Sequence, residues 1–153
     1  MNGMGIGSAA ALCVAASGSL LMVGMLTGIW KYLQMSRSPE GLAHPYVDIC
    51  HRTALLYSFA ALVLAALAHF SAWSETLNFW AAAVTLFYFV AAIANYALHG
   101  VLQDTDNQLR RPHRLGSGTV PGAVIHAAML GLIVGEVGGL SVLLSGALKT
   151  LYG

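Results

Sequence analysis

The amino-acid sequence predicts an all-α integral membrane protein folded as a four-helix bundle. The chain has 153 residues, of which 58% are hydrophobic and only 8% are charged, whereas soluble domains average roughly 25% charged residues. Four apolar segments are each long enough to supply the roughly 20 residues that a helix needs to cross the hydrocarbon core. The net charge of +1 gives no electrostatic reason to expect nucleic acid as a partner. We therefore expect the lipid bilayer to surround the protein.

The four helices are expected to form one transmembrane domain, residues 1–153. The first apolar run has no Lys or Arg before it and is too long for the apolar part of a signal peptide, so we expect a retained helix. The second helix follows a polar connection that contains Pro39 and Pro45, the third follows the tight turn SAWSET, and the fourth follows a long polar connection. The expected helices lie at about 8–31, 49–72, 76–100 and 121–148.

The basic residues predict how the chain is oriented in the membrane. Because successive spanning helices alternate in direction, the first and third connections share one membrane face. Only Lys149 lies on the other face, whereas the face of the two long connections carries the other six basic residues, Lys31, Arg37, Arg52, Arg110, Arg111 and Arg114. The positive-inside rule then predicts cytoplasmic long loops. We expect a multi-pass protein of the cell inner membrane.

Small residues indicate where helix backbones approach closely. They recur every fourth residue in the fourth helix and also occur in the first helix, at Ala127, Gly131, Gly135 and Gly139 and at Gly24 and Gly28. Such a pattern suits either packing within one chain or contact between subunits. A chain with only four helices has little interior, so we expect a homo-oligomer.

The histidines are unevenly distributed over this topology. Only His69 is expected at the external face, whereas five fall towards the cytoplasmic face, at His44, His51, His99, His113 and His126. Clustering of this kind favours a ligand-binding or proton-handling site.

His51 and its neighbour Asp48 are three residues apart, on nearly the same face of the second helix. A neutral imidazole can bind iron through one nitrogen while a carboxylate or a carbonyl holds its other N–H, and Asp48 is a candidate for that role. The alternative is an ordinary histidine at the membrane interface.

Two features lie deeper in the membrane. Tyr88, Asn95 and His99 fall on one stripe of the third helix, which is either a polar clamp between helices or one wall of a pocket. Glu136 lies near the middle of the fourth helix, where a charged group costs about 2.5–3.5 kcal/mol on insertion scales. Its carboxyl group is either functional or bonded to a closely packed backbone.

The motifs of several enzyme classes do not occur. The sequence contains no Gly-rich phosphate loop, G-x-S-x-G, HExxH or CxxC. One haem or one mononuclear metal at the cytoplasmic side is the chemistry that suits these histidines. Haem is favoured, because an apolar bundle can bury the macrocycle while a single histidine holds the iron. The candidate cofactor-binding residues are His51, Asp48, His44 and His126.

The order of features along the chain resembles the styrene oxide isomerases, which are small four-helix integral-membrane enzymes. The shared elements are a Gly-containing first helix ending near a Trp (GMLTGIW), the tetrapeptide SPEG (residues 38–41) and a histidine that opens the second helix. An Ala-Asn pair in the third helix (Ala94, Asn95), an Asn-containing polar loop and a Gly-Pro-rich entry to an Ala/Gly-rich fourth helix follow.

This resemblance implies haem b bound between the subunits of a trimer, with a histidine on the iron. Ferric iron then acts as a Lewis acid on the oxygen of a small apolar epoxide, and ring opening with a 1,2-shift gives an aldehyde. The iron ligand would be His51, with His44 as its competitor. The family's tyrosine, four residues after the asparagine, corresponds to His99, and its asparagine, six residues after the ligand, corresponds to Tyr57.

The leading hypothesis is therefore a haem b-dependent epoxide isomerase with Tyr57, Asn95 and His99 as catalytic residues around the substrate. If His99 instead took the sixth iron position, the protein would be a bis-histidine, cytochrome b-like electron carrier. A non-enzymatic helical membrane module is the third possibility.

Overall fold

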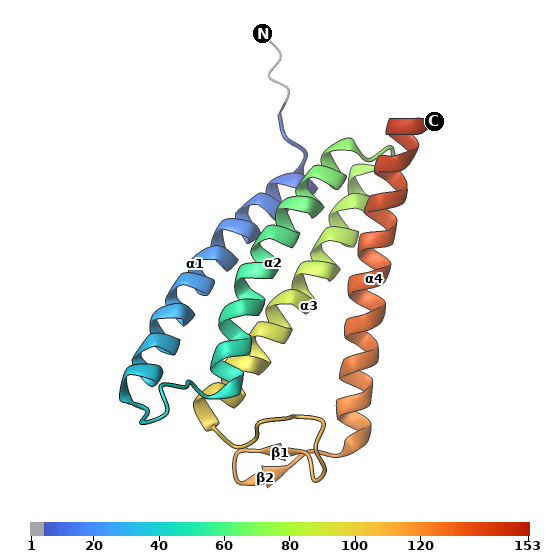
Figure 1. Ribbon diagram of the computed structural model, residues 1–153. Coiled ribbons are helices and arrows are strands. Elements are labelled where there is room, and N and C mark those ends of the chain that lie inside the picture. The colour runs from blue at the N-terminus through green and yellow to red at the C-terminus, as the bar shows by residue number, and fades with distance from the viewer. Residues whose placement is uncertain (1–4) are drawn as a thin grey trace.

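Four long helices make up most of the computed structural model, which describes residues 5–153 (Figure 1). They are α1 (Ser8–Arg37), α2 (Pro45–Phe70), α3 (Glu75–Leu102) and α4 (Gly122–Tyr152). The connection between α3 and α4 carries a small antiparallel hairpin of β1 (Arg114–Leu115) and β2 (Gly118–Thr119). All four helices are long and apolar enough to cross a membrane. The predicted all-α membrane bundle is confirmed.

The helix ends differ from the expected ones most clearly around the first connection. Helix α1 continues six residues past position 31 to Arg37, and α2 begins at Pro45 rather than at 49. A proline fits the first turn of a helix because its missing N–H would have no partner there. Nδ1 of His44 caps the same turn by accepting a hydrogen bond from the Tyr46 N–H at 3.3 Å. The loop shrinks accordingly to seven residues, 38–44.

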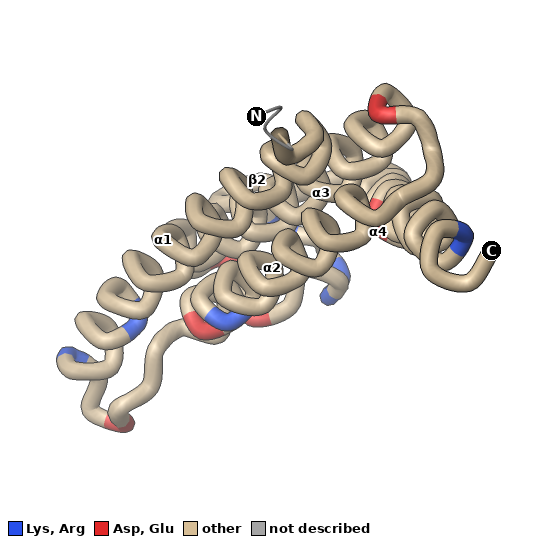
Figure 2. The backbone as a smooth tube through the Cα atoms, turned by 90° about the horizontal axis from the view of Figure 1, so that it is seen from above, with Lys and Arg blue, Asp and Glu red and all other residues tan. Residues whose placement is uncertain are grey.

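The bundle has two distinct ends. The start of α1, the turn between α2 and α3 and the C-terminus lie at one end, and the α1–α2 loop and the hairpin lie at the other (Figure 1). Charged residues occupy few positions, and most of each helix carries none (Figure 2). Helix α1 packs against α2 and α3, and α4 packs against α3 and α2. This arrangement brings α2, α3 and α4 together around the middle of the bundle.

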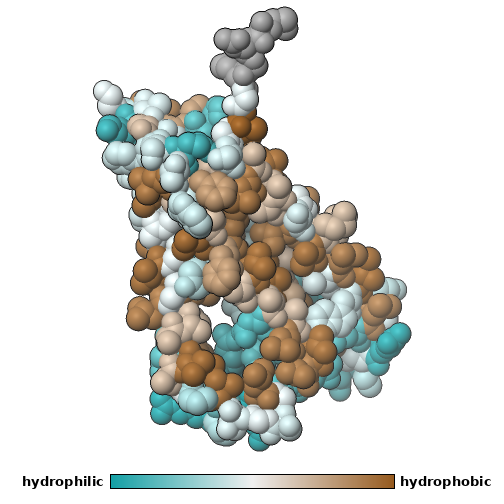
Figure 3. Space-filling view, turned by 180° about the vertical axis from the view of Figure 1, so that it is seen from behind, coloured by the Kyte–Doolittle hydropathy of each residue, from teal (hydrophilic) through white to brown (hydrophobic). Residues whose placement is uncertain are grey.

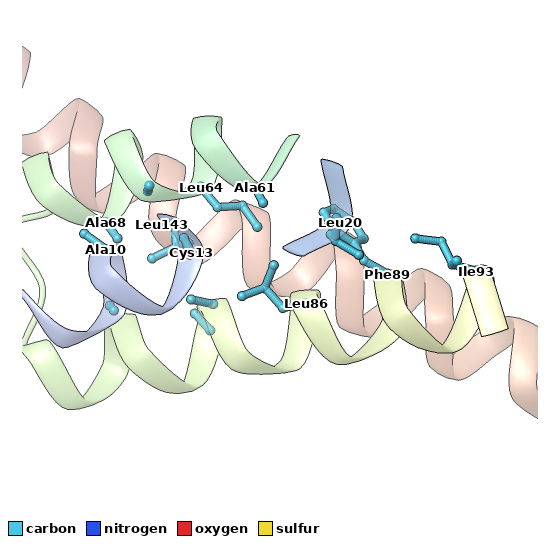
Figure 4. Packing of buried hydrophobic residues seen from close by; sticks show 14 of the residues in the cluster. Ala10, Cys13, Leu20, Ala61, Leu64, Ala68, Leu86, Phe89, Ile93 and Leu143 are labelled. Atoms are coloured by element: carbon cyan, nitrogen blue, oxygen red, sulfur yellow. The ribbon is translucent and has the colours of Figure 1, made fainter. Parts of the chain in front are cut away.

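The core consists mainly of small and aliphatic side chains (Figure 4). Cys13 of α1 and Cys50 of α2 are both free and fully buried. The hydroxyl of Ser17 donates to the backbone carbonyl of Ser58 at 2.8 Å, which joins α1 to α2. At the N-terminus of α1, Oε1 of Glu75 accepts hydrogen bonds from the Ser8 hydroxyl and the Ala9 N–H at 2.8 and 2.7 Å.

The glycines of α4 face α3 of the same chain. A Cβ atom at Gly131 would lie 2.8 Å from the Tyr88 hydroxyl, and one at Gly135 would overlap the Tyr88 ring. A Cβ atom at Gly139 would overlap the Thr85 hydroxyl. Residues larger than glycine do not fit at these three positions because α3 occupies the space. The glycines of α4 therefore serve packing within the protomer.

Candidate functional site

His51 lies in the contact between α2 and α1. Its Nδ1 is 2.8 Å from the carbonyl oxygen of Gly24, and a Cβ atom at Gly28 would lie 2.9 Å from its Cε1. Because a carbonyl only accepts hydrogen bonds, Nδ1 carries the hydrogen and Nε2 of the neutral ring keeps its lone pair. The contact with α1 therefore fixes the tautomer that a metal ligand needs.

Nε2 of His51 is not fully buried within the protomer. It makes no hydrogen bond within residues 5–153. It is also not among the fully buried polar atoms without a partner in this range, which are Asn78 Oδ1 and His113 Nε2. The ring as a whole is half-buried between the helices.

Asp48, which the spacing placed beside His51, is engaged elsewhere. Its carboxylate lies 2.6 Å from Nζ of Lys31 and 3.2 Å from Nε of Arg52. The group that holds the His51 ring is the Gly24 carbonyl. Residue spacing along one helix cannot predict a hydrogen-bond partner that the backbone of another helix supplies.

His99 joins the end of α3 to the hairpin. Its Nδ1 donates to Oδ1 of Asp104 at 2.8 Å, and both side chains are at most 5% exposed. The other carboxylate oxygen of Asp104 accepts the N–H of Gly116 at 2.5 Å. Burial by itself raises the pKa of Asp104, but these hydrogen bonds outweigh it and hold the pKa below its usual value. We call this group, His99 with Asp104 and the Gly116 N–H, the His99–Asp104 clamp.

Asn95 lines a cavity between α3 and α4. The cavity has a volume of about 420 Å³, and Tyr57, Tyr88 and Gln108 also line it; we call it the Asn95 cavity. The side-chain amide of Asn95 donates to Oε1 of Gln108, in the connection that closes the hairpin end. Tyr88 and Asn95 of the predicted stripe thus face inward, whereas His99 extends to the hairpin. Figure 3 shows the molecule hollowed near the hairpin end.

Tyr57 and Glu136 form a hydrogen-bonded pair in the middle of the bundle. The Tyr57 hydroxyl donates to Oε1 of Glu136 at 3.2 Å, and its ring stacks on Phe89 with centroids 3.9 Å apart. Both members of the pair line a second cavity, of about 360 Å³, which we call the Glu136 cavity. Tyr57 stands between the two cavities because it lines both. The pair joins residues 79 positions apart, which sequence spacing cannot reveal.

The remaining histidines lie apart from His51. His44 caps α2, and burial lowers its pKa although Asp104 and Asp106 oppose the shift. His113 is buried beside Gly122, with Nδ1 3.0 Å from the Gln108 carbonyl, and His126 is exposed on α4. Within residues 5–153, the structure contains no group of three His, Cys, Asp or Glu residues that could hold a metal ion.

The predicted site residues therefore occupy three different places. His51 faces α1, whereas Tyr57 projects from α2 towards α3 and α4, on the side of Asn95. His99 belongs to the clamp at the hairpin. Within one protomer, a group on His51 and a molecule in the Asn95 cavity would lie on different sides of α2.

Comparisons of the chain with protein-family models, with curated proteins and with solved structures find no match.

Proposed function

We propose that this membrane protein binds haem b through Nε2 of His51 and isomerises a small apolar epoxide to an aldehyde. The observation that supports this most directly is the state of the His51 ring. Its Nδ1–H is held by the Gly24 carbonyl, as a histidine ligand needs its second nitrogen held, and its Nε2 has no hydrogen-bond partner within residues 5–153. The resemblance to the styrene oxide isomerases supplies the cofactor and the reaction.

The position of His51 suits a haem held between subunits. Because Nε2 has no hydrogen-bond partner within residues 5–153, a neighbouring copy would complete the pocket, in keeping with the homotrimer that the resemblance implies. Ferric haem supplies a Lewis acid when it is bound. The apolar walls of the chain exclude water. The Asn95 amide and the Tyr57 hydroxyl lie on the other side of α2 from His51 within one protomer, so those of a neighbouring copy would orient a substrate oxygen. The hairpin end is proposed to face the cytoplasm at the inner membrane.

The geometry does not favour an electron carrier with His51 and His99 on the same iron. The His99 ring lies beside Asp104 at the hairpin end of α3, whereas the His51 ring lies against Gly24 and Gly28 of α1. The two histidines of one protomer thus face different neighbours.

An absorption spectrum of the detergent-purified protein tests the proposal. We expect a Soret band with ferric haem that responds to azide or cyanide. His51→Ala should abolish haem retention, because the only protein bond to iron is lost. His69→Ala is the matched control, since that ring is exposed near the other end of α2, and it should retain haem.

Three results would contradict the proposal. Wild-type protein without a Soret band would leave a non-enzymatic helical module, and full haem retention by His51→Ala would move the ligand to another histidine. A low-spin spectrum that ignores added azide and cyanide would instead indicate the bis-histidine carrier.

A further inference from the structure

The polar groups of the Glu136 cavity are almost all committed to partners in the protein. The Thr85 hydroxyl donates to the Ala81 carbonyl at 3.0 Å, and the Tyr57 hydroxyl donates to Oε1 of Glu136. Oε2 of Glu136 makes no hydrogen bond within residues 5–153. The rest of the lining is apolar and includes Leu64 and Phe89. One carboxyl oxygen is therefore the free polar group of an apolar cavity.

No cation accompanies this carboxyl group. The ion pairs in residues 5–153 are those of Lys31, Arg52, His99 and Arg110 with aspartates, and none includes Glu136. An ionised carboxylate without a cation is costly at this depth in a membrane. We therefore expect the neutral acid, which has one O–H to donate.

We propose that the Glu136 cavity is a binding site for a small apolar molecule with one acceptor oxygen, such as an aryl ketone, an ether or an epoxide. The ligand's oxygen accepts the hydrogen bond of the Glu136 carboxyl group, and its apolar part fills the cavity. The volume of about 360 Å³ is within the range of known small-molecule sites. This site is independent of haem at His51.

The ligand enters from the bilayer. Val63, Val137 and Leu140 line the cavity and are 56%, 60% and 41% exposed on the surface of the bundle, where lipid surrounds the helices. An apolar molecule dissolved in the bilayer reaches the cavity without crossing water. Tyr57 acts as a positioning residue, because its hydrogen bond to Oε1 holds the carboxyl group and leaves Oε2 without a partner within residues 5–153.

The test compares two probes of similar shape, acetophenone, which has a carbonyl oxygen, and ethylbenzene, which has none. Equilibrium dialysis of protein in nanodiscs, corrected for partition into empty nanodiscs, gives both affinities. Glu136→Leu should weaken acetophenone binding about tenfold, the effect of losing one buried hydrogen bond, and leave ethylbenzene binding within threefold. Ala60→Phe, which fills the cavity, should weaken the binding of both probes.

An infrared measurement on the wild-type protein tests the hydrogen bond without relying on the folding of a variant. The carbonyl band of ¹³C-labelled acetophenone should move to lower frequency on binding to wild-type protein. Glu136→Gln, which keeps a donor, should alter this shift, whereas His51→Ala should leave it unchanged even if haem is lost. Three outcomes would overturn the proposal: equal binding of both probes to wild type and Glu136→Leu, an unshifted carbonyl band, or the absence of binding. The first of these would indicate a site for a lipid acyl chain.

Discussion

Replacing Asp104 by Ala is expected to destabilise the protein by about 2–4 kcal/mol. The substitution removes both acceptors of the His99–Asp104 clamp, so the His99 Nδ1–H and the Gly116 N–H lose their partners in a site that is at most 5% exposed. Leaving a buried donor unsatisfied costs about 1–3 kcal/mol per group. Unfolding in mixed micelles with increasing SDS, followed by circular dichroism, measures the loss.

The clamp also predicts a dependence of stability on acid pH. The pKa of Asp104 is lower in the folded protein than its usual value, so the stability that this carboxylate contributes is complete above the unfolded pKa of about 3.9. It is lost as pH falls through the lower folded pKa. Asp104→Ala should lack this acid-dependent component. Asp106→Ala is the matched control, because its ion pair with Arg110 is exposed and contributes little. Equal stability of wild type and Asp104→Ala would contradict a structural role for the clamp.

Gly139→Ala is expected to destabilise the bundle by about 1–3 kcal/mol, the usual effect of overpacking. A Cβ atom at this position would overlap the Thr85 hydroxyl and lie 2.6 Å from the Ala81 carbonyl oxygen. The backbone of α3 cannot yield as a flexible side chain would, so α4 has to move away. The SDS concentration at the unfolding midpoint measures the effect.

The neighbouring glycine provides the control for Gly139. A Cβ atom at Gly138 meets nothing within 4 Å, and alanine is favoured over glycine inside a helix by about 0.8–1.0 kcal/mol. Gly138→Ala should therefore be neutral or stabilising. Equal effects of the two substitutions would show that α3 and α4 do not approach as described.

Hydropathy was sufficient to predict four membrane-spanning helices but not where each helix ends. Helix α1 continues through its polar last turn to Arg37 because nothing stops it before Pro39. Helix α2 starts at Pro45 because the proline has no N–H that needs a partner there and Nδ1 of His44 accepts the Tyr46 N–H. Helix ends depend on caps and prolines, whereas the apolar stretch marks only the part inside the lipid.

The candidate site was predictable residue by residue but not as an arrangement. Spacing within α2 correctly placed Asp48 near His51, but Lys31 of α1 pairs with that carboxylate. The partner of His51 is a backbone oxygen of α1, and the partner of Glu136 is a tyrosine of α2. Periodicity shows which residues share a face of one helix, but the rotation of each helix against its neighbours follows from packing.

The position of Tyr57 gives the two cavities a wall in common. Its ring is fixed on one side by Phe89 and at its hydroxyl by Glu136, so a molecule that displaces the ring in one cavity changes the shape of the other. Binding in the two cavities is then thermodynamically linked, and each ligand alters the affinity of the other by the same factor. Tyr57 would set the sign of that cooperativity.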